Sequence, residues 1–203
     1  MRIGAILLAG GRSERMGRPK ESLPLHGNTL LGRAVKCLVG AADPVVVVAR
    51  DEQQALPPLP HGVVRIHDER SGAGPLEALV TALRWLGDRA GFAADDAAFV
   101  TACDQPFLSA EAVQWLVDRL GDHELVMPRA GGLLQPLCAV YRLSVLAFAE
   151  RLLATGTETP RSLAAAATAR VLDEDELRSF DPRLRFLQNL NTPEDYRRAL
   201  GST

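Results

Sequence analysis

The sequence predicts an α/β protein, a three-layer αβα sandwich of Rossmann-like type with a mostly parallel central sheet. Two observations predict this fold class. Short apolar runs of strand length alternate along the chain with segments whose apolar residues recur at helical spacing. The runs at 3–9 and 45–49 hold no polar residue, which is typical of strands that are covered on both faces.

Length and composition indicate an ordinary globular protein. The chain has 203 residues, of which 47% are hydrophobic and 24% charged, so we expect one domain over residues 1–203. A formal charge of −2 favours neither nucleic acid nor an anionic membrane as a partner. The apolar runs are too short to span a bilayer, and the first strand begins too early to leave room for a signal peptide. These features predict a cytoplasmic protein.

The three cysteines, Cys37, Cys103 and Cys138, are odd in number and lie far apart in apolar contexts. No CxxC pattern or Cys/His pairing accompanies them, so they are expected to be reduced core residues rather than metal ligands.

The first strand, 3–9, ends in Gly10 and Gly11, and a group of cations follows: Arg12, Arg15, Arg18 and Lys20. Glycines allow successive backbone N–H groups to converge on phosphate oxygens. The segment matches neither GxxxxGK followed by Ser or Thr nor GxGxxG, the two standard phosphate-binding patterns. A plain strand-to-helix turn with solvated arginines is the alternative at this point.

The next elements extend the alternation of strands and helices. Thr29 is expected to cap a helix whose apolar face runs from Leu30 to Leu38. Strands are expected at 45–49 and 63–66, with a proline-rich connector between them.

A second glycine-rich loop follows the strand at 63–66, and Pro75 then opens a helix. Because ligands of open α/β sheets bind outside the carboxyl ends of the strands, Asp68 and this loop should line the same crevice as Gly10 and Gly11. Asp68 as a capping or turn residue is the alternative.

Residues 97–101 are expected to form a central strand that ends in the sequence CDQP at 103–106. An aspartate at this position, fixed by a proline turn, is suited to hold Mg²⁺ beside phosphates, so Asp104 is the candidate metal ligand. Ser109 should cap the following helix, and a simple turn role for Asp104 is the weaker alternative.

The second half is less regular. Strands are expected at 125–128 and 137–141, helices at 144–154 and 160–167, and an edge strand at 170–172. The acidic sequence DEDELR at 173–178 is expected to be a solvated turn. Thr192, followed by Pro193 and an acid at the third helical position, should cap a final helix and leave the amides of Asn189 and Asn191 available for another task.

Four segments taken together resemble the molybdenum cofactor guanylyltransferase family, a branch of the nucleotidyltransferases that share this αβα sandwich. They are LAGGRSERMGRPK at 8–20, the loop at 68–76, CDQP at 103–106 and NLNTPED at 189–195, and the similarity spans nearly the whole chain. The first motif is common to the superfamily, whereas the ending and the form LAGG point to the guanylyl branch.

The resemblance implies a GTP-dependent transfer assisted by Mg²⁺. The terminal phosphate of molybdopterin would attack the α-phosphate of GTP and release pyrophosphate. The resemblance also implies transient contact with enzymes that receive the cofactor. The implied nucleotide-binding residues are Leu8, Ala9, Gly10, Gly11, Arg12, Ser13, Lys20, Asp68, Gly74 and Asp104. Of these, Asp104 would hold the metal; Arg15, Lys20 and Asp104 would be catalytic, and Asn189 and Asn191 would face the pterin.

Three departures from the family pattern bear on the nucleotide base. Pro19 precedes Lys20 where an aspartate is usual, no asparagine ends the second strand, and Glu77-Ala78 replaces Ala-Gly. A molybdopterin cytidylyltransferase or a sugar-phosphate nucleotidyltransferase therefore remains an alternative, although NLNTPED argues against both. A non-catalytic nucleotide-binding module is a third reading, and the presence of Lys20 and Asp104 counts against it.

Overall fold

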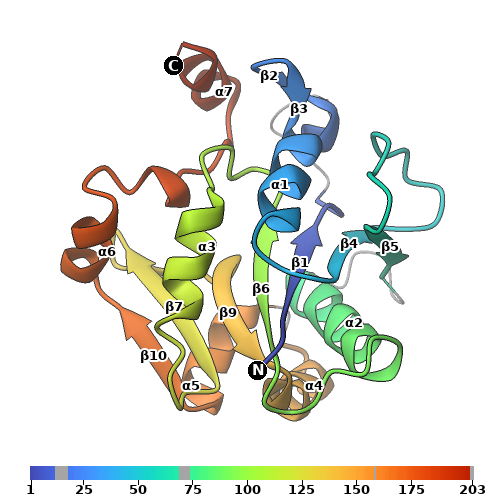
Figure 1. Ribbon diagram of the computed structural model, residues 1–203, viewed down its shortest axis with the longest axis vertical. Coiled ribbons are helices and arrows are strands. Elements are labelled where there is room, and N and C mark those ends of the chain that lie inside the picture. The colour runs from blue at the N-terminus through green and yellow to red at the C-terminus, as the bar shows by residue number, and fades with distance from the viewer. Residues whose placement is uncertain (12–17, 69–73, 158, 202–203) are drawn as a thin grey trace.

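The computed structural model describes residues 1–11, 18–68, 74–157 and 159–201 of the chain. These residues form an eight-stranded sheet in the order β10-β7-β9-β6-β1-β4-β5, with β8 paired to β7, and a separate pair of short strands, β2 and β3 (Figure 1). The strands of the large sheet are β1 (Ile3–Leu8), β4 (Val45–Ala49), β5 (Val64–His67), β6 (Ala97–Ala102), β7 (Leu125–Ala130), β8 (Leu133–Leu134), β9 (Cys138–Arg142) and β10 (Ala169–Leu172).

The centre of the sheet is parallel, as the sequence predicts. Strand β1 pairs in parallel with β6 on one side and with β4 on the other, and β5 continues the parallel order. Strand β9 is antiparallel to both β6 and β7, while β10 runs parallel to β7. The carboxyl ends of β1, β4, β5 and β6 therefore meet along one edge, which is where this class of sheet binds its ligands.

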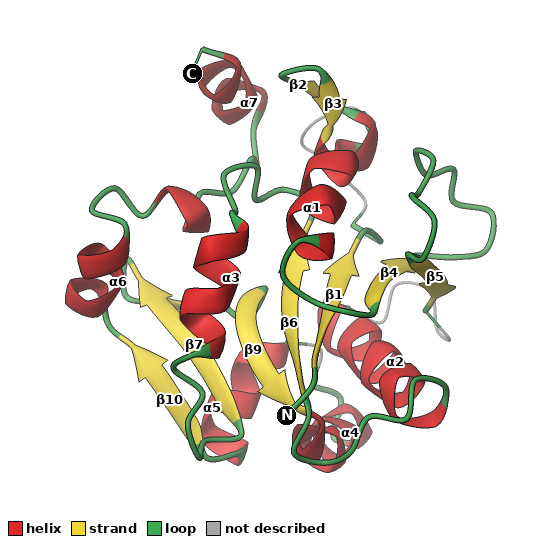
Figure 2. Ribbon diagram, in the orientation of Figure 1, coloured by secondary structure: helices red, strands yellow, loops and turns green. Residues whose placement is uncertain are grey.

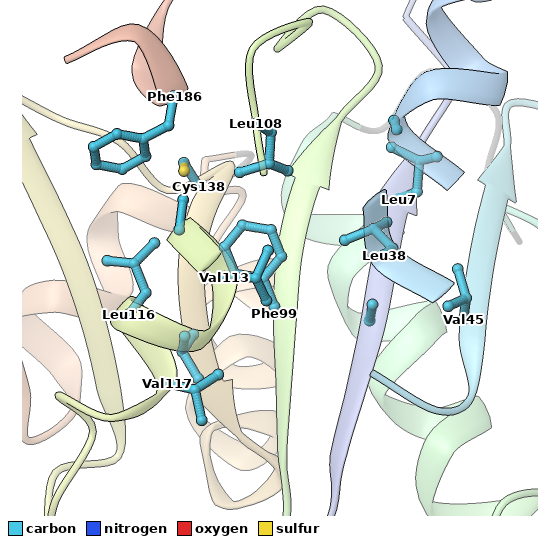
Figure 3. Packing of buried hydrophobic residues seen from close by; sticks show 14 of the residues in the cluster. Leu7, Leu38, Val45, Phe99, Leu108, Val113, Leu116, Val117, Cys138 and Phe186 are labelled. Atoms are coloured by element: carbon cyan, nitrogen blue, oxygen red, sulfur yellow. The ribbon is translucent and has the colours of Figure 1, made fainter. Parts of the chain in front are cut away.

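Helices cover both faces of the sheet (Figure 2). They are α1 (Leu30–Val39), α2 (Pro75–Asp88), α3 (Ala110–Val117), α4 (Leu146–Ala154), α5 (Leu163–Ala166), α6 (Glu174–Phe180) and α7 (Pro193–Leu200). Alternate residues of β1 separate into two cores: Ala5 and Leu7 pack in the cluster that includes α1 and α3, and Ile6 and Leu8 in the cluster that includes α2. Figure 3 shows the first cluster, in which Phe99 lies between Val113 of α3 and the strands. The predicted three-layer sandwich is confirmed.

A third, smaller apolar cluster joins residues 23–30 to the C-terminal segment. It contains Leu23 and Leu25 near the strand pair β2 (Pro24–Leu25) and β3 (Asn28–Thr29), together with Leu190 and Ala199 from the C-terminal segment. The Tyr196 hydroxyl donates a hydrogen bond to the Pro24 carbonyl. Figure 1 shows α7 and the β2–β3 pair beyond the end of the sheet toward which β1 points. The last helix is thereby placed at the ligand-binding edge.

The predicted caps are present where the sequence places them. Thr29 accepts a hydrogen bond from Gly32 N, and Ser109 accepts one from Ala112 N. Thr192 and Asp195 form a reciprocal capping box at the start of α7. Pro75 occupies the first turn of α2.

The prediction of a solvated turn at 173–178 is wrong, because these residues begin helix α6. Leu177 is fully buried, and it anchors this helix to the core. Glu174 pairs with Arg178 one turn later, and Glu176 accepts hydrogen bonds from Arg119 and Arg170. Acidic side chains also suit the positive end of the helix dipole. The acidic run is therefore a helix N-terminus held by arginines.

Two shorter differences concern the second half. The helix expected at 160–167 is a 3₁₀ turn, Pro160–Ser162, followed by the short α5. The helix expected at 144–154 likewise begins with a 3₁₀ turn, Leu143–Val145, before α4.

All three cysteines are free thiols: Cys103 and Cys138 are buried, and Cys37 is half-buried, in agreement with the sequence-based expectation. Among the helices of the described residues, none has the length and apolar character needed to cross a membrane.

Candidate nucleotide-binding site

A cavity of about 570 Å³ opens at the carboxyl ends of the parallel strands. Its lining includes nine of the residues singled out from the sequence: Leu8, Ala9, Gly10, Gly11, Lys20, Asp68, Gly74, Asp104 and Asn191. Asn189 is half-buried and is not part of this lining. Arg12, Ser13 and Arg15 lie outside the described residues. The structure thus brings together segments that are up to 183 positions apart, from Leu8 to Asn191.

Gly10 marks a close approach between two backbones. A Cβ atom on Gly10 would lie 3.1 Å from the Cα atom of Arg50, the residue that follows β4. A side chain here would push the Arg50 backbone away by a few tenths of an ångström, so glycine lets the loop after β1 lie closest to the end of β4. Among the described residues, no atom lies within 4 Å of a Cβ added to Gly11.

Lys20 lies at a junction of three segments. It opens the 3₁₀ turn η2 (Lys20–Ser22), and its Nζ donates to Asp104 Oδ2 at 3.0 Å and to Asn191 Oδ1 at 3.1 Å. The backbone N–H of Leu190 also donates to the Asp104 carbonyl at 2.8 Å. The ammonium group is therefore held between the end of β6 and the segment before α7, where it partly neutralises the Asp104 carboxylate.

The surroundings of Asp104 fit a metal ion that arrives with its substrate. Within the described residues, no group of three or more His, Cys, Asp or Glu side chains is placed to hold a metal. Mg²⁺ commonly binds proteins through one or two carboxylates and takes its remaining ligands from phosphates and water. A single carboxylate in the cavity lining suits that mode.

Asp68 has a buried oxygen that finds no hydrogen-bond partner among the described residues. This oxygen is Oδ1, which is shielded from solvent although the residue lines the cavity. Burial, and to a smaller extent the nearby Glu77, raise the pKa of this carboxyl group to about 6. Because an unpaired buried acceptor is costly, a ligand that donates a hydrogen bond here would be stabilised.

Three further polar residues belong to the site but were not identified from the sequence. Glu21 and Arg50 line the cavity, and Gln54 lies directly behind them. Glu21 and Gln54 are almost completely buried, which is unusual for these residue types. No periodicity or motif marks them, since their burial depends on how the loop after β4 folds against the loop after β1.

Residues 5–171 match the family described as the MobA-like NTP transferase domain. The chain belongs to this family. A relative from Carboxydothermus hydrogenoformans, named as a probable molybdenum cofactor guanylyltransferase, is 31% identical over 98% of this chain and 95% of its own length. A relative of the same name from Mycolicibacterium paratuberculosis is 37% identical over 97% and 94% of the two chains.

The solved structure of molybdopterin-guanine dinucleotide biosynthesis protein A from Archaeoglobus fulgidus is similar to this MobA-like chain. Its TM-score is 0.77, with 25% identity and coverage of 99% of this chain and 97% of the other. The coverage is nearly complete in both directions, so the likeness includes the β2–β3 pair and the C-terminal helix as well as the central sheet. The expectation of a nucleotidyltransferase fold is confirmed.

Proposed function

We propose that this MobA-like protein is a molybdenum cofactor guanylyltransferase. It transfers GMP from GTP to the terminal phosphate of molybdopterin and forms molybdopterin guanine dinucleotide and pyrophosphate. The names of its full-length relatives support this assignment. The observation that carries it in the structure is the meeting of the glycine loop, Lys20, Asp104 and Asn191 around one cavity.

The reaction needs charge neutralisation and alignment more than it needs a base. A phosphate monoester is already an oxyanion near neutral pH, so its oxygen can attack without losing a proton to the protein. A new bond forms between that oxygen and the α-phosphorus, the α-phosphorus to bridging-oxygen bond breaks, and pyrophosphate leaves with the electron pair. The main barrier that the protein can lower is the repulsion between two anions, together with their misalignment.

The residues of the cavity divide this work. We assign the backbone of Ala9, Gly10 and Gly11 to the GTP phosphates and Lys20 to the neutralisation of their charge. Arg12, Ser13 and Arg15 are proposed to add to the same anion site. Mg²⁺, held by Asp104, would supply Lewis-acid neutralisation of the phosphate oxygens when it is bound.

The opposite ends of the cavity serve the base and the acceptor. Asp68, in the loop that ends at Gly74, is suited to guanine, because an ionised carboxylate accepts hydrogen bonds from the ring N–H and the exocyclic amino group side by side. Cytosine presents only its amino group as a donor, so it matches this carboxylate less well. Asn191, at the side of the cavity nearest α7, is proposed to contact molybdopterin, with Asn189 as a further contact.

A base-competition assay tests the assignment. The purified protein is incubated with molybdopterin, Mg²⁺ and equal concentrations of GTP, CTP and ATP. The dinucleotide products are then separated and identified by mass spectrometry. The expected product is the guanine dinucleotide, with equimolar pyrophosphate. A cytosine dinucleotide as the main product would instead identify a cytidylyltransferase, and nucleotide binding without any product would favour a non-catalytic module.

A further inference from the structure

The Gln54 side chain lies behind the cavity rather than in its lining, and it joins three separate segments. Gln54 is 6% exposed to solvent. The Nε2 atom donates to the Ala9 carbonyl at 2.9 Å and to Glu21 Oε1 at 2.8 Å. The Oε1 atom accepts from the Arg50 backbone N–H at 2.6 Å. One amide group thus connects the end of β1, the turn that carries Lys20, and the end of β4.

These hydrogen bonds surround the close approach at Gly10. Ala9 precedes Gly10 in the chain, and Arg50 is the residue whose backbone a Cβ on Gly10 would meet. Gln54 binds the backbone of both Ala9 and Arg50, so it holds the two strand ends together where they come closest. A small displacement of either strand end would change the direction of the N–H groups that the loop presents to an anion.

The hydrogen bond from Gln54 to Glu21 also influences the position of Lys20. Glu21 follows Lys20 directly in η2 and is 4% exposed, and Gln54 donates a hydrogen bond to its carboxylate. A buried carboxylate that loses its donor is strongly destabilised. The Gln54 amide therefore stabilises the position of η2, from which the Lys20 side chain reaches Asp104 and Asn191.

The loop that contains Gln54 is itself held in place by Arg65, a residue that is not part of the cavity lining. The Arg65 guanidinium, on β5, donates to the carbonyls of Glu52 at 3.1 Å and of Gln54 at 2.7 Å. Arg65 thus binds the backbone carbonyl of Gln54, while the side-chain amide of Gln54 binds Ala9 and Glu21. Such support from a second set of contacts is what keeps a binding group in one geometry.

We propose that Gln54 is a positioning residue for the nucleotide phosphates, which acts through Ala9, Arg50 and Glu21 without touching the ligand. This inference rests on the proposed function, because it assigns the anion loop and Lys20 to a nucleoside triphosphate. Only an amide can donate to a carbonyl and a carboxylate and also accept from an N–H group. A carboxylate at position 54 would face the Glu21 carboxylate and the Ala9 carbonyl with no hydrogen to offer.

The test compares Gln54→Glu with Gln53→Glu, a matched control that adds the same charge one residue earlier at an exposed position. The dissociation constants of GTP and of inorganic triphosphate, each with Mg²⁺, are measured by calorimetry on the intact protein. Gln54→Glu is expected to weaken both by about tenfold or more, because two donated hydrogen bonds are lost beside a buried carboxylate. Gln53→Glu is expected to bind both as the wild type does. Equal weakening of both probes distinguishes phosphate positioning from an effect on the base.

The exchanged pair Glu21→Gln with Gln54→Glu separates positioning from general destabilisation. An amide at position 21 donates to a carboxylate at position 54, although the Ala9 carbonyl still lacks its donor. The double variant is therefore expected to recover part of the lost affinity and to bind GTP and triphosphate more tightly than Gln54→Glu alone. A merely structural loss at position 54 would lower the melting temperature without such a recovery of affinity. Should Gln54→Glu fail to fold, Gln54→Met, which removes the hydrogen bonds without adding charge, must show the same loss of affinity.

The outcomes distinguish this inference from the function on which it rests. Folded Gln54→Glu that binds GTP and triphosphate with wild-type affinity would overturn the role of Gln54 and leave the proposed function intact. A weakening that Gln53→Glu shares would overturn it as well. A wild-type protein that binds no GTP would overturn both the proposed function and the inference.

Discussion

At the scale of single residues, the site consists of charges that the fold keeps close together. Lys20 and Asp104 pair at 3.0 Å while both side chains are mostly shielded from solvent, at 17% and 21% exposure. An exposed ion pair of this kind adds little to the free energy of unfolding. In a cavity that is partly shielded from water, the same two charges interact more strongly with a bound anion and a bound cation. Substitution of either residue should therefore reduce activity more than it reduces stability.

Asp104→Asn tests this expectation. The amide keeps the size of the side chain and an oxygen for Lys20, but it removes the charge that would hold Mg²⁺. We expect kcat to fall by about a hundredfold or more, with little change in the circular dichroism spectrum. Activity near the wild-type rate in a quenched-flow or pyrophosphate-release assay would exclude Asp104 as the metal ligand.

The role proposed for Asp68 predicts that guanine binding depends on pH. The pKa of Asp68 is raised to about 6, mainly by burial, so the carboxylate proposed to accept hydrogen bonds from guanine is lost as the pH falls through that value. We expect the affinity for GTP to weaken below about pH 6 in the wild type, and Asp68→Asn to bind GTP about tenfold more weakly without this pH dependence. Calorimetric titrations with GTP over a pH series check both statements, and an unchanged pH profile in the variant would contradict them.

The raised pKa of Asp68 also makes the stability of the unliganded protein depend on pH. The folded state holds the Asp68 proton more tightly than the unfolded state, whose carboxyl has a pKa near its ordinary value of 3.8. The free energy of unfolding should therefore decrease as the pH rises from that value through about 6. Asp68→Asn should reduce this decrease in urea titrations made at each pH.

At the scale of elements, the C-terminal helix α7 and the β2–β3 pair form a support for the cavity. Their shared apolar cluster includes Leu190, whose N–H binds the Asp104 carbonyl, and the next residue, Asn191, binds Lys20. The start of α7 is fixed by the capping box of Thr192 and Asp195. The conformation of the helix start should therefore influence the Lys20 and Asp104 pair.

Thr192→Ala measures this influence. Loss of the cap is expected to lower the free energy of unfolding by about 1 kcal/mol, measured by urea denaturation, and to weaken GTP binding. Ser109→Ala is the matched control. Ser109 caps α3 through the same type of hydrogen bond, but no residue of α3 is among those that line the cavity. Weaker GTP binding in both variants would show that global stability, rather than the position of Asn191, is responsible.

At the scale of the whole molecule, the cavity joins segments from both halves of the chain. The loop after β1, the turn η2, the end of β6 and the segment before α7 all contribute to it. Helices on both faces of the sheet hold the strand ends at fixed spacing, so a bound nucleotide would contact several of these segments at once. Ligand binding should therefore stabilise the entire fold.

Thermal unfolding with a panel of nucleotides measures this coupling. GTP with Mg²⁺, at about a hundred times its dissociation constant, is expected to add about 2.7 kcal/mol to the free energy of unfolding. CTP at the same concentration should raise the melting temperature less, because Asp68 meets fewer donors. Equal shifts, or a larger shift with CTP, would contradict the choice of guanine.

The sequence by itself determined the central strands, the main helix caps and the position of the cavity. These features follow from local rules: apolar periodicity marks covered strands, Thr29, Ser109 and Thr192 announce helix starts, and glycines and Asp104 follow strand ends. Only the tertiary structure decided that Asn191 meets Lys20, that the acidic run at 173–178 is helical, and that Gln54 and Glu21 are buried together. The physical reason is that burial of a polar or charged side chain depends on partners from distant segments, and no local pattern encodes which segment will supply the hydrogen bond.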